Sequence, residues 1–143
     1  MKRILTSIAL AAAILVSGAT ASLANRLVAH VDISNQTMTV KKDGRTIHRW
    51  RVSTARSGYR TPTGQWKPTR MHKMWYSRKY DMSPMPYSIF FYGGYAIHGT
   101  NAVKALGRPA SHGCIRLDTD NARKLYQLTK QVGANNMRVV ITH

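Results

Sequence analysis

The chain contains no glutamate and only five aspartates among its 143 residues. A mechanism of the glycosidase type needs two carboxylates that flank one bond. Asp118 and Asp120 are close in sequence, but they stand where a helix is expected to begin, which is a favoured place for capping residues. The scarcity of acids therefore argues against catalysis by paired carboxylates.

No apolar run is long enough to cross a bilayer comfortably, because a spanning helix needs about 20 apolar residues. The longest run covers residues 4–16, with a basic pair before it and small residues after it. This order is typical of a secretory signal peptide, and an uncleaved membrane anchor is the weaker alternative. We expect residues 1–24 to be the signal, with cleavage after Ala21 or Ala24. Residues 25–143 would then form one exported domain in the periplasm or cell envelope, without a transmembrane anchor.

Cys114 is the only cysteine of the chain. A single thiol in an exported protein cannot form an internal disulfide. It can be a buried apolar filler, a metal ligand, an intermolecular bridge or a nucleophile. His98 and His112 favour the nucleophile, because an imidazole can act as the base that a thiol needs.

Basic residues, in contrast, are abundant. Lysine and arginine total 22, which gives a formal net charge of +17. Such a charge concentrates anionic partners around the protein. Because export removes the chain from nucleic acid, we expect no nucleic-acid partner and instead anionic cell-envelope polymers or lipid headgroups. Alternatively, the basic residues only keep the surface hydrated and bind no specific partner.

Short strands separated by turn residues dominate the rest of the sequence. The alternation of apolar residues over 27–33, the turn at Asp43-Gly44 and a returning strand over 46–54 predict an opening β-meander. A second strand pair is expected over 87–92 and 95–98, and a closing strand over 137–142.

Two further segments complete the predicted fold. Residues 70–85 are basic and aromatic without clear periodicity, which we interpret as an irregular flap over a substrate groove or as a plain surface loop. One helix should begin at Asp118 or Thr119 and end at Gly133. The predicted fold class is mainly β, a single sandwich or barrel domain with one or two short helices.

The reactivity of Cys114 depends on its surroundings. A free thiol has a pKa near 8.5, so a base or positive neighbours such as Arg108 and Arg116 must raise its thiolate fraction. Lowering the pKa by about two units would take roughly 2.7 kcal/mol. If residues 111–117 return beside the strand that ends at His98, thiol and imidazole meet at neighbouring strand ends. We therefore prefer His98 to His112 as the base.

Backbone groups complete this hypothetical site. A base needs a third group to orient it, and with so few acids a backbone carbonyl, locally that of Gly99, is the best candidate. The N–H groups of Gly113 and Cys114 could bind a developing oxyanion.

The sequence His98-Gly99-Thr100, followed after a gap by Ser111-His112-Gly113-Cys114-Ile115-Arg116-Leu117, resembles the active-site motif of the YkuD-type L,D-transpeptidases. The likeness extends to the early meander, to Thr61-Pro62-Thr63-Gly64 and to the strand pair before His98. It implies a β-sandwich-like catalytic domain, a thioester acyl-enzyme and peptidoglycan stem peptides as substrates, with no metal or organic cofactor.

The resemblance also assigns roles by position. It implies Cys114 as the nucleophile, His98 as the base and the Gly99 carbonyl as the orienting third member. His112 and Gly113 would support the oxyanion site, while Arg116 would bind a substrate carboxylate and Ser111 would contact the substrate. A tyrosine of the flap region is expected to close over the acyl group, and the candidates are Tyr76, Tyr80 and Tyr87.

The implied reaction is attack on the carbonyl of the third residue of a tetrapeptide stem, release of D-Ala and transfer of the acyl group to an amine. The product would be a 3→3 cross-link or an anchored protein. With water as the acceptor, the same site would be an L,D-carboxypeptidase. Carbapenems are expected to acylate the thiol.

Two rival functions remain at this point. A zinc hydrolase could use His98, His112 and Cys114 as ligands, but it usually needs a glutamate base that this chain lacks. A non-catalytic, basic envelope-binding protein would need no reactive thiol at all.

Overall fold

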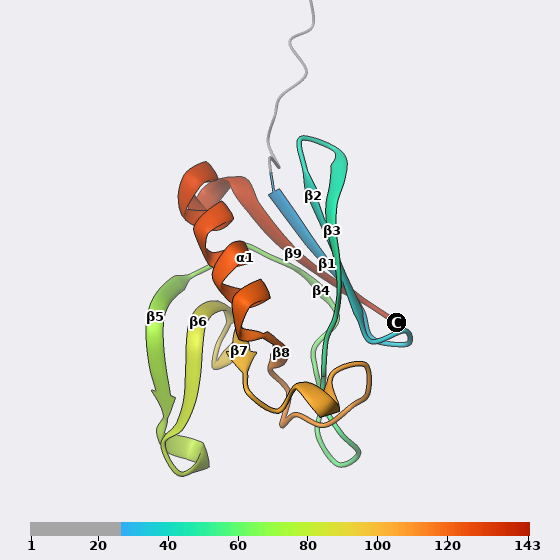
Figure 1. The fold of residues 1–143 in the computed structure, drawn as a ribbon, viewed down its shortest axis with the longest axis vertical. Helices are drawn as coiled ribbons and strands as arrows, with labels where there is room; N and C mark the ends of the chain where they lie inside the picture. The colour runs from blue at the N-terminus through green and yellow to red at the C-terminus, as the bar shows by residue number, and fades with distance from the viewer. Residues whose placement is uncertain (1–26) are drawn as a thin grey trace, which may run out of the picture.

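The computed structural model describes residues 27–143, which fold into two β-sheets and one α-helix (Figure 1). This architecture confirms the predicted mainly β class. The predicted signal at residues 1–24 lies outside the described residues. The helix lies between the two sheets and packs mainly on the smaller one, so side chains from both sheets and the helix form the main hydrophobic core.

The larger sheet has the strand order β3-β2-β1-β9-β4. Its strands are β1 (Leu27–Asp32), β2 (Thr37–Lys42), β3 (Arg45–Arg51), β4 (Gly64–Trp66) and β9 (Met137–Thr142). The first three form the predicted antiparallel meander. Asp43 and Gly44 both have positive φ in the turn between β2 and β3, as a tight hairpin turn requires. The last strand, β9, returns parallel to β1 and closes the domain.

The smaller sheet has the strand order β5-β6-β7-β8. It contains β5 (Arg70–Ser77), β6 (Ser83–Tyr92), β7 (Tyr95–Thr100) and β8 (Ile115–Asp118). The interpretation of residues 70–85 as irregular was wrong. They form β5, a short 3-10 turn η1 (Arg78–Tyr80) and the beginning of β6, which together make a long hairpin at the lower left of Figure 1.

The reason for this error lies in β5. None of its eight residues is buried, so its two faces differ little in exposure. Basic and apolar side chains occur on both faces. The segment therefore lacks the alternation of apolar and polar residues by which a half-buried strand is recognised in sequence.

The helix α1 (Thr119–Val132) follows β8 directly. The Asp118 carboxylate accepts a hydrogen bond from the Asp120 N–H at 2.9 Å, and the Gly133 N–H closes the other end on the Thr129 carbonyl. Both predicted helix ends are therefore confirmed. Two further 3-10 turns, η2 (Val103–Ala105) and η3 (Ala134–Asn136), lie in connecting segments.

Gly99 allows the start of α1 to lie close against β7. A Cβ at this position would approach the Cα and Oγ1 of Thr119 to 2.9 Å, a distance that real Cβ atoms do not adopt. The close approach fixes the end of β7 beside the end of β8, where the motif residues are found.

Candidate active site

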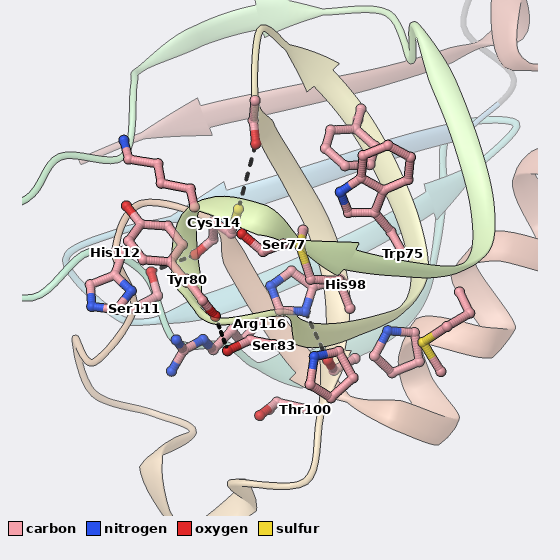
Figure 2. A pocket seen from close by; sticks show the side chains of 18 of the residues that line it. Trp75, Ser77, Tyr80, Ser83, His98, Thr100, Ser111, His112, Cys114 and Arg116 are labelled. Carbon is pink, nitrogen blue, oxygen red and sulfur yellow. Dashed lines mark hydrogen bonds between the residues drawn. The ribbon is translucent and has the colours of Figure 1, made fainter.

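The parallel strands β7 and β8 bring the two halves of the motif together. His98 lies directly opposite Arg116, and Ile97 lies opposite Ile115. One position earlier, the same register places Cys114 opposite Ala96. Because alternate residues of a strand share a face, His98, Cys114 and Arg116 all point to the same side of the sheet. All three line one cavity, as Figure 2 shows.

This cavity has a volume of about 850 Å³. The hairpin of β5 and β6 forms one wall, and the segments that carry His98 and Cys114 form another. The residues that line the cavity include four cations, Arg70, Arg78, Lys79 and Arg116. No aspartate is among the lining residues. The chain has no glutamate that could add a carboxylate.

The orientation of His98 is set by a backbone carbonyl. Its Nδ1 lies 2.8 Å from the Gly99 oxygen, the pairing that the sequence suggested. Because a carbonyl oxygen only accepts, Nδ1 carries the proton and Nε2 is left as the basic nitrogen. Burial lowers the pKa of His98 to about 4, against the opposing effect of the Gly99 hydrogen bond, and the charge of Arg116 adds to the lowering. His98 is therefore a neutral imidazole at pH 7.

The Cys114 thiol is half-buried and lies 3.8 Å from the Gly94 carbonyl oxygen. Burial raises the pKa of the thiol, and neither the backbone hydrogen bond of Ala96 nor the charge of Arg116 reverses this effect. The expectation of a lowered thiol pKa was therefore wrong. Cys114 packs against the small apolar cluster of Met85, Phe90 and Ala96, and desolvation disfavours the thiolate.

His112 has a different environment from His98. Its Nε2 lies 3.0 Å from the Arg56 guanidinium and accepts a hydrogen bond from it. Its ring stacks on Tyr80 at 4.2 Å between centroids and contacts Tyr59 at 4.7 Å. Desolvation, followed by the charges of Arg56, Arg116 and Lys79, lowers the pKa of His112. These contacts connect His112 to the tip of the flap.

A small hydrogen-bond network fixes the loop before Cys114. The buried Ser111 hydroxyl donates to the Cys114 carbonyl at 2.6 Å and accepts from the Gly113 N–H at 3.0 Å. The Thr61 hydroxyl donates to the Gly113 carbonyl at 2.8 Å and accepts from the Ala55 N–H. Ser111 is thus engaged on both sides, and the Gly113 N–H already has a partner.

The three candidate tyrosines lie in different places. Tyr80 lines the cavity, whereas neither Tyr76 nor Tyr87 does. The Tyr76 side chain is exposed on β5, and the Tyr87 ring packs edge-on against Tyr126 of α1.

Sequence reasoning missed several residues of the site. Arg56 and Tyr59 hold His112, Thr61 holds Gly113, and the Gly94 carbonyl contacts the thiol. Of these residues, only Thr61 could have been found from the sequence, because it belongs to the Thr61-Pro62-Thr63-Gly64 segment on which the family resemblance partly rests. The other contacts join segments that are far apart in the chain.

The structure of residues 27–143 does not support the zinc-hydrolase hypothesis. Within residues 27–143, no group of three or more histidine, cysteine or aspartate side chains is arranged to hold a metal ion. In the same part of the chain, no helix has the length and hydrophobicity to cross a membrane.

Comparison with known families agrees with this geometry. Residues 26–141 match the profile of YkuD, the L,D-transpeptidase catalytic domain, so the chain belongs to that family. Among curated proteins, no sequence matches significantly.

Solved structures show the same fold. The chain is 29% identical to an L,D-transpeptidase from Stackebrandtia nassauensis, with a TM-score of 0.72 over 83% of this chain and 56% of that one. An L,D-transpeptidase from Mycobacterium tuberculosis gives 23% identity and a TM-score of 0.72, over 82% and 58% of the two chains. An L,D-transpeptidase from Mycobacterium smegmatis gives 21% identity and a TM-score of 0.71, over 82% of this chain and 59% of that one. The chain thus spans less than two thirds of the length of these proteins.

Proposed function

We propose that this protein is a peptidoglycan L,D-transpeptidase in which Cys114 carries the acyl group and His98 moves the protons. The observation that carries this proposal is the pairing of His98 with the Gly99 carbonyl in the cavity that also contains the only cysteine. Membership of the YkuD family supports the same reaction class.

The resting site is a neutral pair. A low pKa of His98 and a raised pKa of Cys114 keep the imidazole unprotonated and the sulfur as a thiol. His98 therefore acts as a general base at the moment of attack, and no preformed ion pair is needed. Cys114 directly precedes β8 and lies diagonally across from His98 of β7, so a rotation of the Cys114 side chain away from Gly94 carries the sulfur toward Nε2.

In the first half-reaction, the thiol proton passes to His98 Nε2 while the sulfur forms a bond to the carbonyl carbon of the third stem residue. The resulting oxyanion is held by backbone N–H groups at Cys114 and Gly113, the latter shared with the Ser111 hydroxyl. Collapse breaks the carbon–nitrogen bond, and D-Ala leaves with the proton from His98. The product is a thioester on Cys114.

In the second half-reaction, an amine attacks the thioester and gives its proton to His98. The carbon–sulfur bond breaks, and the proton returns to the sulfur. An amine of another stem gives a 3→3 cross-link, an amine of an envelope protein gives an anchored protein, and water gives a tripeptide. Tyr80 closes the flap over the acyl group, and Arg116 binds a carboxylate of the substrate.

We also infer that the protein is exported, with residues 1–24 as its signal, since the proposed substrate lies outside the cytoplasmic membrane. The formal net charge of +17, or +15 without Lys2 and Arg3 of the signal, favours anionic polymers of the envelope as additional partners.

Incubation of the purified protein with disaccharide-tetrapeptides, followed by mass spectrometry, tests the reaction. A dimer that lacks one D-Ala indicates transpeptidation, and a tripeptide alone indicates the carboxypeptidase alternative. Cys114→Ser should abolish both products and the adduct with a carbapenem, while His30→Gln, a histidine of the other sheet, should keep them. Unchanged substrate with the wild-type protein would contradict the proposal, and activity lost on chelation would favour the zinc hydrolase.

A further inference from the structure

The proposed active-site cavity has an unbalanced charge. Its lining includes four permanent cations and no carboxylate from the protein. Arg116 stands on the strand that follows Cys114, whereas Arg70 stands at the far edge of the same sheet, on β5. A cavity of this kind favours a ligand with more than one negative group.

Arg70 occupies a defined place relative to the nucleophile. Arg70 lies opposite Phe90, Phe90 lies opposite Ala96, and the register of β7 with β8 continues this row to Cys114. The Arg70 guanidinium lies 3.9 Å above the centroid of the Phe90 ring, so it reaches inward over β6. Neighbouring strands are about 4.8 Å apart, which places it roughly 10 Å from the strand that carries Cys114.

Two aromatic rings lie beside the Arg70 guanidinium and restrict its position. Besides Phe90, the indole of Trp75 lies 5.2 Å from the guanidinium carbon. An arginine that contacts aromatic rings can still offer N–H groups to a carboxylate, in the two-pronged arrangement that a guanidinium and a carboxylate form. In residues 27–143, no aspartate forms a salt bridge with Arg70.

The spacing is compatible with one particular carboxylate of a stem peptide. A γ-linked dicarboxylic residue directly before the acylated residue carries its free carboxylate seven covalent bonds from the attacked carbonyl. With bonds of about 1.5 Å, an extended chain covers roughly 9 Å between these groups. That span agrees with the distance between Arg70 and the strand of Cys114.

We propose that Arg70 is a specificity-determining residue that binds this carboxylate and selects donor stems in which it is free over stems in which it is a carboxamide. This inference rests on the proposed transpeptidase function and assigns Arg70 a group distinct from the one assigned to Arg116. Arg70 also covers Phe90, which is only 2% exposed, and the experiment must separate this packing role from recognition.

The test uses two synthetic tetrapeptide donors that differ only in this carboxylate or carboxamide, with D-Ala release as the measurement. The wild-type protein should have about tenfold higher kcat/KM for the carboxylate donor, mainly through KM, because a charge-assisted pair is lost with the amide. Arg70→Gln should bring the ratio close to one. Arg70→Met, which keeps an apolar cover over Phe90, should do the same, while Arg70→Lys should keep part of the preference.

Arg49→Gln is the matched control, because Arg49 lies on β3 of the other sheet and the substitution removes the same charge. It should retain the full preference. Equal ratios in the wild type, Arg70→Gln and Arg70→Met would overturn the inference, as would a wild-type enzyme without preference. Failure of the wild type to release D-Ala from either donor would contradict the proposed function itself, and this inference with it.

Discussion

His98 and Arg116 face each other directly across the parallel strands β7 and β8, beside the Cys114 thiol. The charge of Arg116 lowers the pKa of His98, and the same charge partly offsets the rise in the pKa of Cys114. Arg116 therefore disfavours a protonated imidazole and favours a negative sulfur. One residue acts on both members of the proposed pair, so substitutions at Arg116 should change the titration of the site as well as substrate binding.

The pH dependence of activity follows from the neutral pair. Because His98 must be unprotonated to accept the thiol proton, kcat/KM should fall as the pH falls through about 4 and should be flat from about pH 5 to pH 7. Arg116→Gln should move this acid limb to higher pH, whatever its effect on the absolute rate. An acid limb near the ordinary histidine pKa in the wild type would show that the imidazole is not buried as described.

The stability of the fold should depend on the same group. The pKa of His98 is lowered from 6.5 to about 4, so the unfolded chain takes up a proton in this range and the folded protein does not. Stability is therefore greatest above pH 6.5 and falls as the pH is lowered toward 4, by up to about 1.4 kcal/mol per pH unit from this residue alone. Urea unfolding of the wild type and of His98→Gln at pH 7 and pH 4.5 measures the difference. Equal pH dependence in both proteins would contradict the assignment.

Gly113 should tolerate no side chain. Its φ is +132°, and a Cβ there would lie 2.7 Å from the Tyr95 ring and 2.8 Å from the Arg60 carbonyl oxygen. Gly113→Ala should cost about 2–4 kcal/mol of unfolding free energy and shift the loop that carries Cys114. Gly94→Ala is the matched control for stability, because a Cβ there meets nothing within 4 Å. A Gly113→Ala protein as stable as Gly94→Ala would count against the loop geometry.

Local signals were sufficient for several elements of the fold. The Asp43-Gly44 turn predicted the first hairpin, and Asp118 with Gly133 marked the two ends of the helix. The return of residues 111–117 beside β7 followed from the motif and its glycines. Each of these features depends on residues that are close together in sequence, or on a motif with a specific pattern.

The failures had long-range causes. The flap escaped prediction because β5 has no buried residue and is recognised as a strand only by its pairing with β6. The predicted direction of the thiol pKa shift was wrong because Cys114 packs against Met85, Phe90 and Ala96, which are distant in sequence, and this burial outweighs the nearby positive charge. His112 is held by Arg56, which precedes it by 56 residues. No local pattern encodes such contacts.

The contact between Tyr80 and His112 should help to close the flap. The rings stack at 4.2 Å with an interplanar angle of 18°, and Tyr80 lies in the turn between β5 and β6. Such a pair contributes about 0.5–1.5 kcal/mol, so Tyr80→Leu should raise KM for the donor about twofold to tenfold. Tyr80→Phe keeps the stacked ring and should behave like the wild type in steady-state kinetics. An equal loss in both variants would assign the effect to the hydroxyl.

Thr61 should be required for the loop that positions the nucleophile, although it contacts neither the thiol nor His98 through a hydrogen bond. Its buried hydroxyl accepts from the Ala55 N–H and donates to the Gly113 carbonyl. Thr61→Val keeps the shape but leaves both backbone groups without this partner, at a cost of about 1–3 kcal/mol. We expect urea unfolding to show this loss and kcat to fall with it, while Thr61→Ser, which restores the hydroxyl, should recover most of both. If the serine variant is no more stable than the valine variant, the hydroxyl is not what holds Gly113 in place.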